Sequence, residues 1–118
     1  MKVILNTDNA FQSLRLREQI ISGIKGELDN VAIDTWAFTK SGENYDILYH
    51  NPSQFVDDPT KNVLFKMDID GSNISFSIVW WKRNPEPSEK MKCLHVGRLT
   101  EMLLYHFKSD FIKLSVID

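Results

Sequence analysis

Two alternating segments that meet at a turn constrain the fold of this chain more than any other feature. From Asn62 to Asp70, and again from Asn73 to Trp80, apolar side chains occupy every second position. Alternation with a period of two places them on one face of a β-sheet. The inward-facing set comprises Val63, Phe65, Met67, Ile69, Ile74, Phe76, Ile78 and Trp80. Turn-forming residues at Asp70–Asn73 separate the two segments, so we predict a β-hairpin.

Two registers of this hairpin keep the same face inward. A two-residue turn at Asp70-Gly71 would pair Met67 with Ile74, whereas a four-residue turn over Asp70–Asn73 would pair Ile69 with Ile74. A slip of one residue would instead turn the whole apolar set toward water. The pattern therefore predicts the buried face and leaves the register open.

Helices are expected near both ends of the chain. The first runs from about Asn9 to Lys25, with Thr7 or Asp8 as its cap, and the second begins at Ser88. The apolar stripe assigned to the first helix consists of Phe11, Leu14, Ile21, Ile24 and Leu28. The second helix carries a broader apolar face, which is wide enough to lie across a sheet.

The remaining strands complete an α+β domain. A second hairpin is expected from Val31–Thr39 and Asn44–His50, with further short strands at Val3–Leu5 and Phe111–Ile117. A chain of 118 residues has the size of one globular domain. We predict a single α+β domain over residues 1–118, with an antiparallel sheet of four to five strands built from two hairpins and flanked by an N-terminal and a C-terminal helix.

Composition favours a cytoplasmic protein. The sequence contains no apolar run of membrane-spanning length, and its start turns polar at Asn6 before a signal-peptide core could form. Cys93 has no cysteine partner, which favours a reducing compartment. A net charge of −2 disfavours general binding to nucleic acid or to anionic lipid.

Acidic side chains gather in one part of the sequence. The stretch from Glu27 to Asp58 contains seven acidic residues and one basic residue, Lys40. The acidic residues are Glu27, Asp29, Asp34, Glu43, Asp46, Asp57 and Asp58. Such an asymmetry can steer a basic partner, although solvated strand edges and loops produce the same pattern.

Candidate chemistry is sparse. His95 and His106 would share a helix face about 16 Å apart, too far for one metal ion, and Asp68–Asn73 is explained as a hairpin turn. Cys93 lies close in sequence to Lys92 and His95, the only support for a reactive thiol; a half-buried structural thiol is the simpler interpretation. We predict no metal, no cofactor and no catalytic residue.

Trp80 and Trp81 would point to opposite faces of a regular strand. One of them therefore leaves the face that carries Phe76 and Ile78. Trp81 either packs beneath the second helix or a loop, or stands exposed beside Lys82 and Arg83 as an anchor of the kind enriched at interface hot spots.

These observations favour a protein that acts by binding another protein. The first hypothesis is a bacterial immunity protein or antitoxin that neutralises a basic toxin domain, such as a nuclease. Its predicted contact residues are Asp34, Glu43, Asp46, Asp57, Asp58 and Trp81. Two alternatives stay open: a secretion-type chaperone acting as a dimer, and a small enzyme that uses Cys93 or His95. Direct binding to nucleic acid or membrane is not expected.

Overall fold

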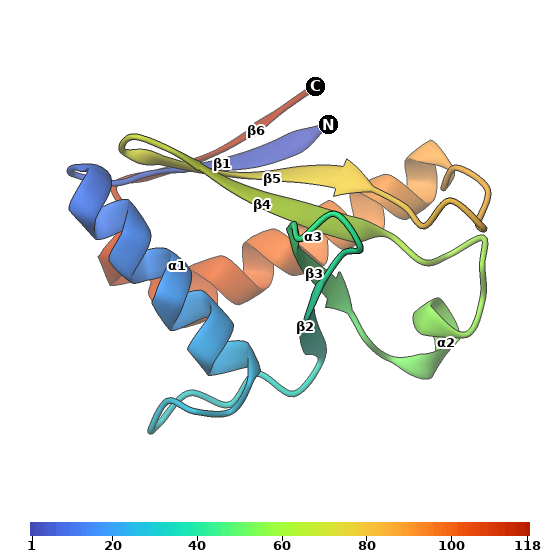
Figure 1. The fold of residues 1–118 in the computed structure, drawn as a ribbon, viewed down its shortest axis with the longest axis horizontal. Helices are drawn as coiled ribbons and strands as arrows, with labels where there is room; N and C mark the ends of the chain where they lie inside the picture. The colour runs from blue at the N-terminus through green and yellow to red at the C-terminus, as the bar shows by residue number, and fades with distance from the viewer.

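The computed structural model describes residues 1–118 as a sheet with two long helices on one face (Figure 1). The six strands are antiparallel and lie in the order β2-β3-β4-β5-β1-β6. The strands are β1 (Lys2–Asn6), β2 (Trp36–Lys40), β3 (Asp46–His50), β4 (Leu64–Asp70), β5 (Asn73–Val79) and β6 (Lys113–Ile117). The helices are α1 (Ala10–Ile24), α2 (Ser53–Val56) and α3 (Glu89–Phe107), with a 3-10 turn at Lys108–Asp110. The predicted α+β class is confirmed, with one or two more strands than expected.

The β4–β5 hairpin adopts one of the two expected registers. Asp70 pairs with Asn73 and Ile69 with Ile74, so only Gly71 and Ser72 lie between paired residues. Gly71 has a φ of 59°, a left-handed conformation that glycine adopts without the strain of a side chain. Phe65 and Phe76 are fully buried between the sheet and the helices, which confirms the predicted inward face.

The N-terminal strand lies inside the sheet. β1 pairs with β5 on one side and with β6 on the other, and its Val3 and Leu5 are fully buried. Together with Phe65, Phe76 and the inward faces of α1 and α3 they form one core cluster of 19 residues. The two ends of the sequence therefore meet at one side of the sheet.

The buried face of α1 differs from the predicted stripe. Asn9 caps the helix by accepting a hydrogen bond from the Gln12 backbone N–H, in place of Thr7 or Asp8. Phe11 and Leu14 are 70% and 55% exposed. The residues of α1 that are buried are Ser13, Leu16, Ile20, Ile21, Gly23 and Ile24. The helix carries two apolar stripes, and the stripe that contains Leu16 and Ile20 is the buried one. A hydrogen bond of 2.7 Å between the Thr7 and Ser13 hydroxyls is buried on the same side of the helix.

α3 begins where the sequence predicts. Ser88 is its N-cap and accepts a hydrogen bond from the Met91 N–H, while Glu89 occupies the first turn, where its charge complements the helix dipole. Its buried face includes Leu99 and Leu103, which contact the core. No helix of the structure combines the length and the apolar character needed to cross a bilayer.

The segments around β2 and α2 depart from prediction. Residues Val31–Thr35 are irregular, so β2 starts at Trp36 and is shorter than the expected strand. The loop expected after His50 contains the short helix α2, which buries Phe55. Asn51-Pro52 still marks the end of β3, because proline supplies no backbone donor to the sheet.

Candidate functional site

A groove lies at one end of the sheet, on the face away from α1 and α3. The register places Leu64 beside Val79, and Ile47 beside Lys66, with their side chains on the face opposite to Phe65 and Leu48. The groove has a volume of about 790 Å³. Its lining residues are Ser41, Gly42, Glu43, Tyr45, Ile47, Leu64, Lys66, Val79, Trp80, Trp81, Lys82 and Arg83. Three segments that are distant in sequence therefore contribute to one surface.

The floor of this groove is apolar. Ile47 and Leu64 are almost fully buried, although neither belongs to the core cluster beneath the helices. The β2–β3 turn and the segment after β5 supply most of the other lining residues, and we infer that they cover these two side chains. The result is a small second hydrophobic cluster on the face of the sheet opposite to the helices.

Aromatic rings and basic side chains line the groove together. The Tyr45 side chain is 41% exposed and that of Trp80 is 37% exposed, which is high for such large rings. The Lys66 Nζ lies 3.7 Å from the centroid of the Tyr45 ring, and the Arg83 guanidinium lies 5.5 Å from that of Trp81. These are cation–π distances, so the rings help to position the charges.

Both tryptophans line the groove, and the Trp80 ring also lies 5.5 Å from the Lys92 Nζ of α3. The prediction that they point to opposite faces assumed a regular strand through Trp81, but β5 ends at Val79. The backbone after Val79 no longer alternates between faces. Trp81 is half-buried in the groove wall and is thus neither sealed under a helix nor fully exposed.

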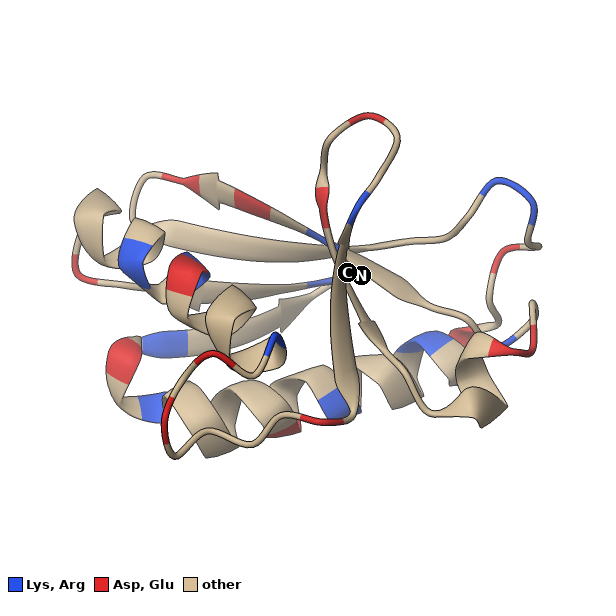
Figure 2. Ribbon diagram, turned by 60° about the horizontal axis from the view of Figure 1, so that its bottom comes forward, with Lys and Arg blue, Asp and Glu red and all other residues tan.

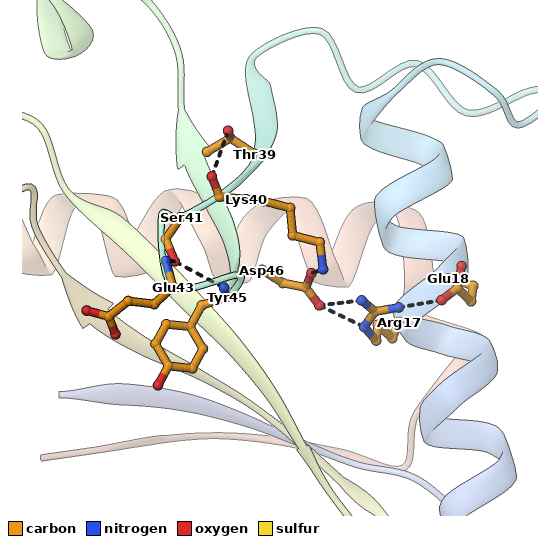
Figure 3. Close-up of polar contacts among 8 residues, drawn as sticks. All are labelled: Arg17, Glu18, Thr39, Lys40, Ser41, Glu43, Tyr45 and Asp46. Carbon is orange, nitrogen blue, oxygen red and sulfur yellow. Dashed lines mark hydrogen bonds and ion pairs between the residues drawn. The ribbon is translucent and has the colours of Figure 1, made fainter.

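Asp46 is not an exposed charge. Its carboxylate is buried and contacts Arg17 of α1 and Lys40 of β2, with the Arg17 Nε 2.9 Å and the Lys40 Nζ 2.6 Å away (Figure 3). Burial alone would raise the pKa of the Asp46 carboxyl, but hydrogen bonds and charges from Lys40 and Arg17 outweigh it and lower this pKa. The side chain ties α1 to the sheet and does not offer a free charge to a partner.

The other predicted acidic residues do not form one surface. Asp34 precedes β2 and Glu43 lies in the turn after it, so the two are at opposite ends of that strand. Figure 2 shows acidic residues on several separate loops. Asp57 is exposed after α2, and Asp58 accepts hydrogen bonds from the Thr60 N–H and hydroxyl, which lower the pKa of its carboxyl. Of the predicted contact residues, only Glu43 and Trp81 meet in the groove.

A pair of histidines is buried on the helix side of the sheet. His95 is 1% exposed, so it lies in the core and not at a helix edge. Its ring lies 4.9 Å from that of Phe55 and 6.0 Å from that of His50, centroid to centroid. Neither ring nitrogen of His95 has a hydrogen-bond partner in the protein, nor has the Nδ1 of His50. Burial, and then the proximity of His50, lower the pKa of His95 to about 4 and outweigh the opposing effect of the Lys61 backbone.

A smaller hollow of about 220 Å³ adjoins His50 and is lined by Arg98, Glu101 and His106 among others. Burial also lowers the pKa of His50, which favours its neutral form. No three metal-ligating side chains come together anywhere in the structure. The hollow therefore combines a neutral imidazole with a surface ion pair between Arg98 and Glu101, whose closest atoms are 3.6 Å apart.

Cys93 and His95 do not form one site. Cys93 is exposed on the outer face of α3, where the sequence favoured a half-buried thiol, whereas His95 points into the core. Residues two apart on a helix project about 200° from each other, which explains the separation. The structure thus places the thiol and the imidazole in different environments.

Comparison with family models, with curated proteins and with solved structures finds no match to this chain. Functional inference therefore depends on the groove and on the chemistry of its residues.

Proposed function

We propose that this chain is a protein-binding protein, and specifically an immunity protein or antitoxin that neutralises a bacterial toxin. The observation that carries the proposal is the groove, where partly exposed rings of Tyr45, Trp80 and Trp81 stand around an apolar floor. Aromatic residues in partly desolvated pockets dominate the binding energy of protein interfaces. The sheet carries the floor residues Ile47 and Leu64, and the rings flank this floor from the β2–β3 turn and the segment after β5.

Inhibition of a toxin needs only such a surface. An immunity protein blocks its target by occupying it, and it contributes no reacting group of its own. Separation of Cys93 from His95 supports this class over an enzyme that would use the two together. A cytoplasmic location belongs to the proposal and is supported by the free, exposed thiol of Cys93, which persists best in a reducing compartment.

The charge of the toxin is a separate part of the proposal. The predicted basic toxin domain would meet the exposed acids Asp34, Asp57 and Asp58. Asp46 no longer supports that arrangement, because Arg17 and Lys40 neutralise it. The groove itself carries positive charge, so the toxin segment that enters it is expected to differ in charge from a basic nuclease surface.

A dimeric secretion-type chaperone is the second candidate, favoured by the outer face of α3. Leu104 and Tyr105 are 44% and 83% exposed there, and Leu94 lies further along the same helix face. An apolar helix face of this kind could pair with a second copy of the chain. Light scattering that shows a dimer dissociated by Tyr105→Ala would favour the chaperone.

The decisive experiment uses the toxin-like product of a gene adjacent to that of this protein. Growth of cells that express this product should be restored by the wild-type chain and lost with Trp81→Ala, which should also weaken binding by about 30-fold or more. Tyr105→Ala is the matched control, since it removes an exposed ring far from the groove. Equal rescue by both variants would remove the groove from the proposal, and no rescue by the wild type would refute the immunity function.

A further inference from the structure

The groove has a charge opposite to that of the whole protein. Its lining contains Lys66, Lys82 and Arg83 against a single carboxylate, Glu43, whereas the chain as a whole has a net charge of −2. Concentration of one sign in a concave surface raises the local potential and attracts the opposite sign. The partner surface that fits here is therefore acidic.

Two of the basic side chains, Lys66 and Arg83, are held in place. Lys66 projects from the middle of β4, with its ammonium over the Tyr45 ring and 3.9 Å from the Asp68 carboxylate, so its position is set by the sheet, by an aromatic residue and by an acidic one. Arg83 is positioned in the same way beside Trp81. In Figure 3, the Glu43 and Tyr45 side chains of the β2–β3 turn point away from the Asp46 cluster, and both residues line the groove. Ordered charges lose less conformational entropy on binding than free lysines do.

We propose that this groove binds an extended acidic segment of a partner protein, with an apolar side chain of that segment against the exposed Tyr45 and Trp80 rings and its carboxylates against Lys66, Lys82 and Arg83. The inference rests on the proposed protein-binding function and names the chemistry of the partner. Alternation of acidic and apolar residues along such a segment would present its apolar side chains to the sheet and its carboxylates to the rim.

The rest of the sheet face argues against nucleic acid in the groove. Beyond Lys66, the residues of β4 on the same face are Asp68 and Asp70, and their partners on β5 are the uncharged Ser75 and Asn73. A strand of phosphates leaving the groove along the sheet would pass both carboxylates and would be repelled. A short peptide needs only the positive end of this face.

Selection from a random dodecapeptide library on the immobilised full-length protein tests the inference directly. We expect the enriched peptides to be rich in Asp and Glu and to carry one or two large apolar residues. Binding of a selected peptide should weaken about tenfold or more when Lys66, Lys82 and Arg83 are all replaced by Gln, and its salt dependence should flatten. Gln shortens these side chains only moderately, and thermal unfolding checks that the variant folds.

A matched control replaces Lys2, Lys90 and Lys108 by Gln, because these bases are exposed and do not line the groove. This control variant should bind the selected peptide as the wild type does. Enrichment of basic or purely apolar peptides, equal weakening in both variants, or tighter binding of oligo-dT than of any selected peptide would overturn the inference. Absence of any enriched peptide would overturn it as well.

Failure of this inference can be told apart from failure of the proposed function. Binding of the toxin-like product that is lost with Trp81→Ala but unaffected by the Lys66, Lys82 and Arg83 substitutions and by salt would keep the protein-binding function and refute the acidic partner. Binding that neither set of substitutions affects would refute the groove as the docking surface. Restoration of growth together with a charge-dependent Kd supports both.

Discussion

Replacement of His95 by Leu should remove a large part of the acid sensitivity of this protein. The buried imidazole has no hydrogen-bond partner and a pKa of about 4, whereas an unfolded chain titrates near 6.5. Protons therefore bind the unfolded state first as the pH falls below about 6.5. The stability that neutral His95 preserves is present above that pH and is lost progressively down to the folded-state pKa of about 4.

The magnitude follows from the two pKa values. The interval between 6.5 and about 4 corresponds to about 3 kcal/mol, of which about 2 kcal/mol is lost between pH 7.5 and 5.0. The pKa of Asp46 is lowered from an ordinary value of 3.8, so loss of its contribution belongs to a more acidic range. His50, whose pKa is also lowered, adds to the loss in the wild type.

Urea denaturation at pH 7.5 and 5.0 measures this effect. The free energy of unfolding of the wild type should fall by about 2 kcal/mol or more between these pH values, and that of His95→Leu by about 2 kcal/mol less. At pH 7.5 the variant should differ from the wild type by less than about 1.5 kcal/mol, because an apolar side chain replaces a ring without partners. The same fall in both proteins would refute the reasoning. If His95→Leu does not fold, an NMR titration of wild-type His95 that gives a pKa near 6.5 would refute it equally.

Four further substitutions test the core, the ion pairs of Asp46 and the thiol. Phe65→Ala and Phe76→Ala should each lower the free energy of unfolding by about 3 to 5 kcal/mol in urea, because both rings are fully buried; losses below about 1 kcal/mol would mean that this face is not the core. Asp46→Asn should cost about 1 to 3 kcal/mol at pH 7, since it removes the buried anion that Arg17 and Lys40 share and leaves Arg17 only the exposed Glu18; an unchanged urea midpoint would show that the ion pairs contribute nothing. Cys93→Ala should shift stability by less than about 0.5 kcal/mol and leave partner binding intact, as expected of an exposed thiol; loss of activity with unchanged stability would favour the enzyme alternative.

Local patterns predicted the parts of the fold that local forces determine. The alternation from Val63 to Ile78 specifies the buried face, because a shift of one residue would expose every apolar side chain in the hairpin. Ser88 and Glu89 likewise predict the start of α3 through capping and the helix dipole. Each of these features depends on residues close together in sequence.

The position of β1 and the buried face of α1 depend on distant contacts. No local pattern predicts that Val3 pairs with Phe76 and Val116, because these two residues belong to strands late in the sequence. On α1, two apolar stripes compete, and packing in the core buries Leu16 while Phe11 stays exposed. The burial of His95 likewise depends on tertiary packing against His50 and Phe55, which its sequence neighbours do not specify.

The groove was only partly predictable, because it depends on the pairing of β3 with β4, and α2 separates these two strands in the sequence. Trp81 was recognised as a candidate contact and Glu43 as an acidic one, but nothing in the sequence brings Lys66 beside Ile47. The alternation along β4 does indicate that Leu64 and Lys66 leave the core face together. The leucine at an outward position of β4 is the local signal that this face of the sheet contacts more than solvent.

The burial of Leu64 also distinguishes the groove from the ordinary solvated face of a sheet. Most outward positions of β4 and β5 hold Lys, Asp, Asn or Ser, as expected for the solvated face of an antiparallel sheet. Leu64 and Val79 are exceptions, and together with Ile47 of β3 they gather at the end where the tryptophans and Tyr45 lie. Cross-strand packing alone would account for the three aliphatic side chains, because paired strands gain stability from apolar neighbours. It does not account for aromatic rings that remain partly exposed around them with cations at their faces, and this combination is why we assign the groove to a partner.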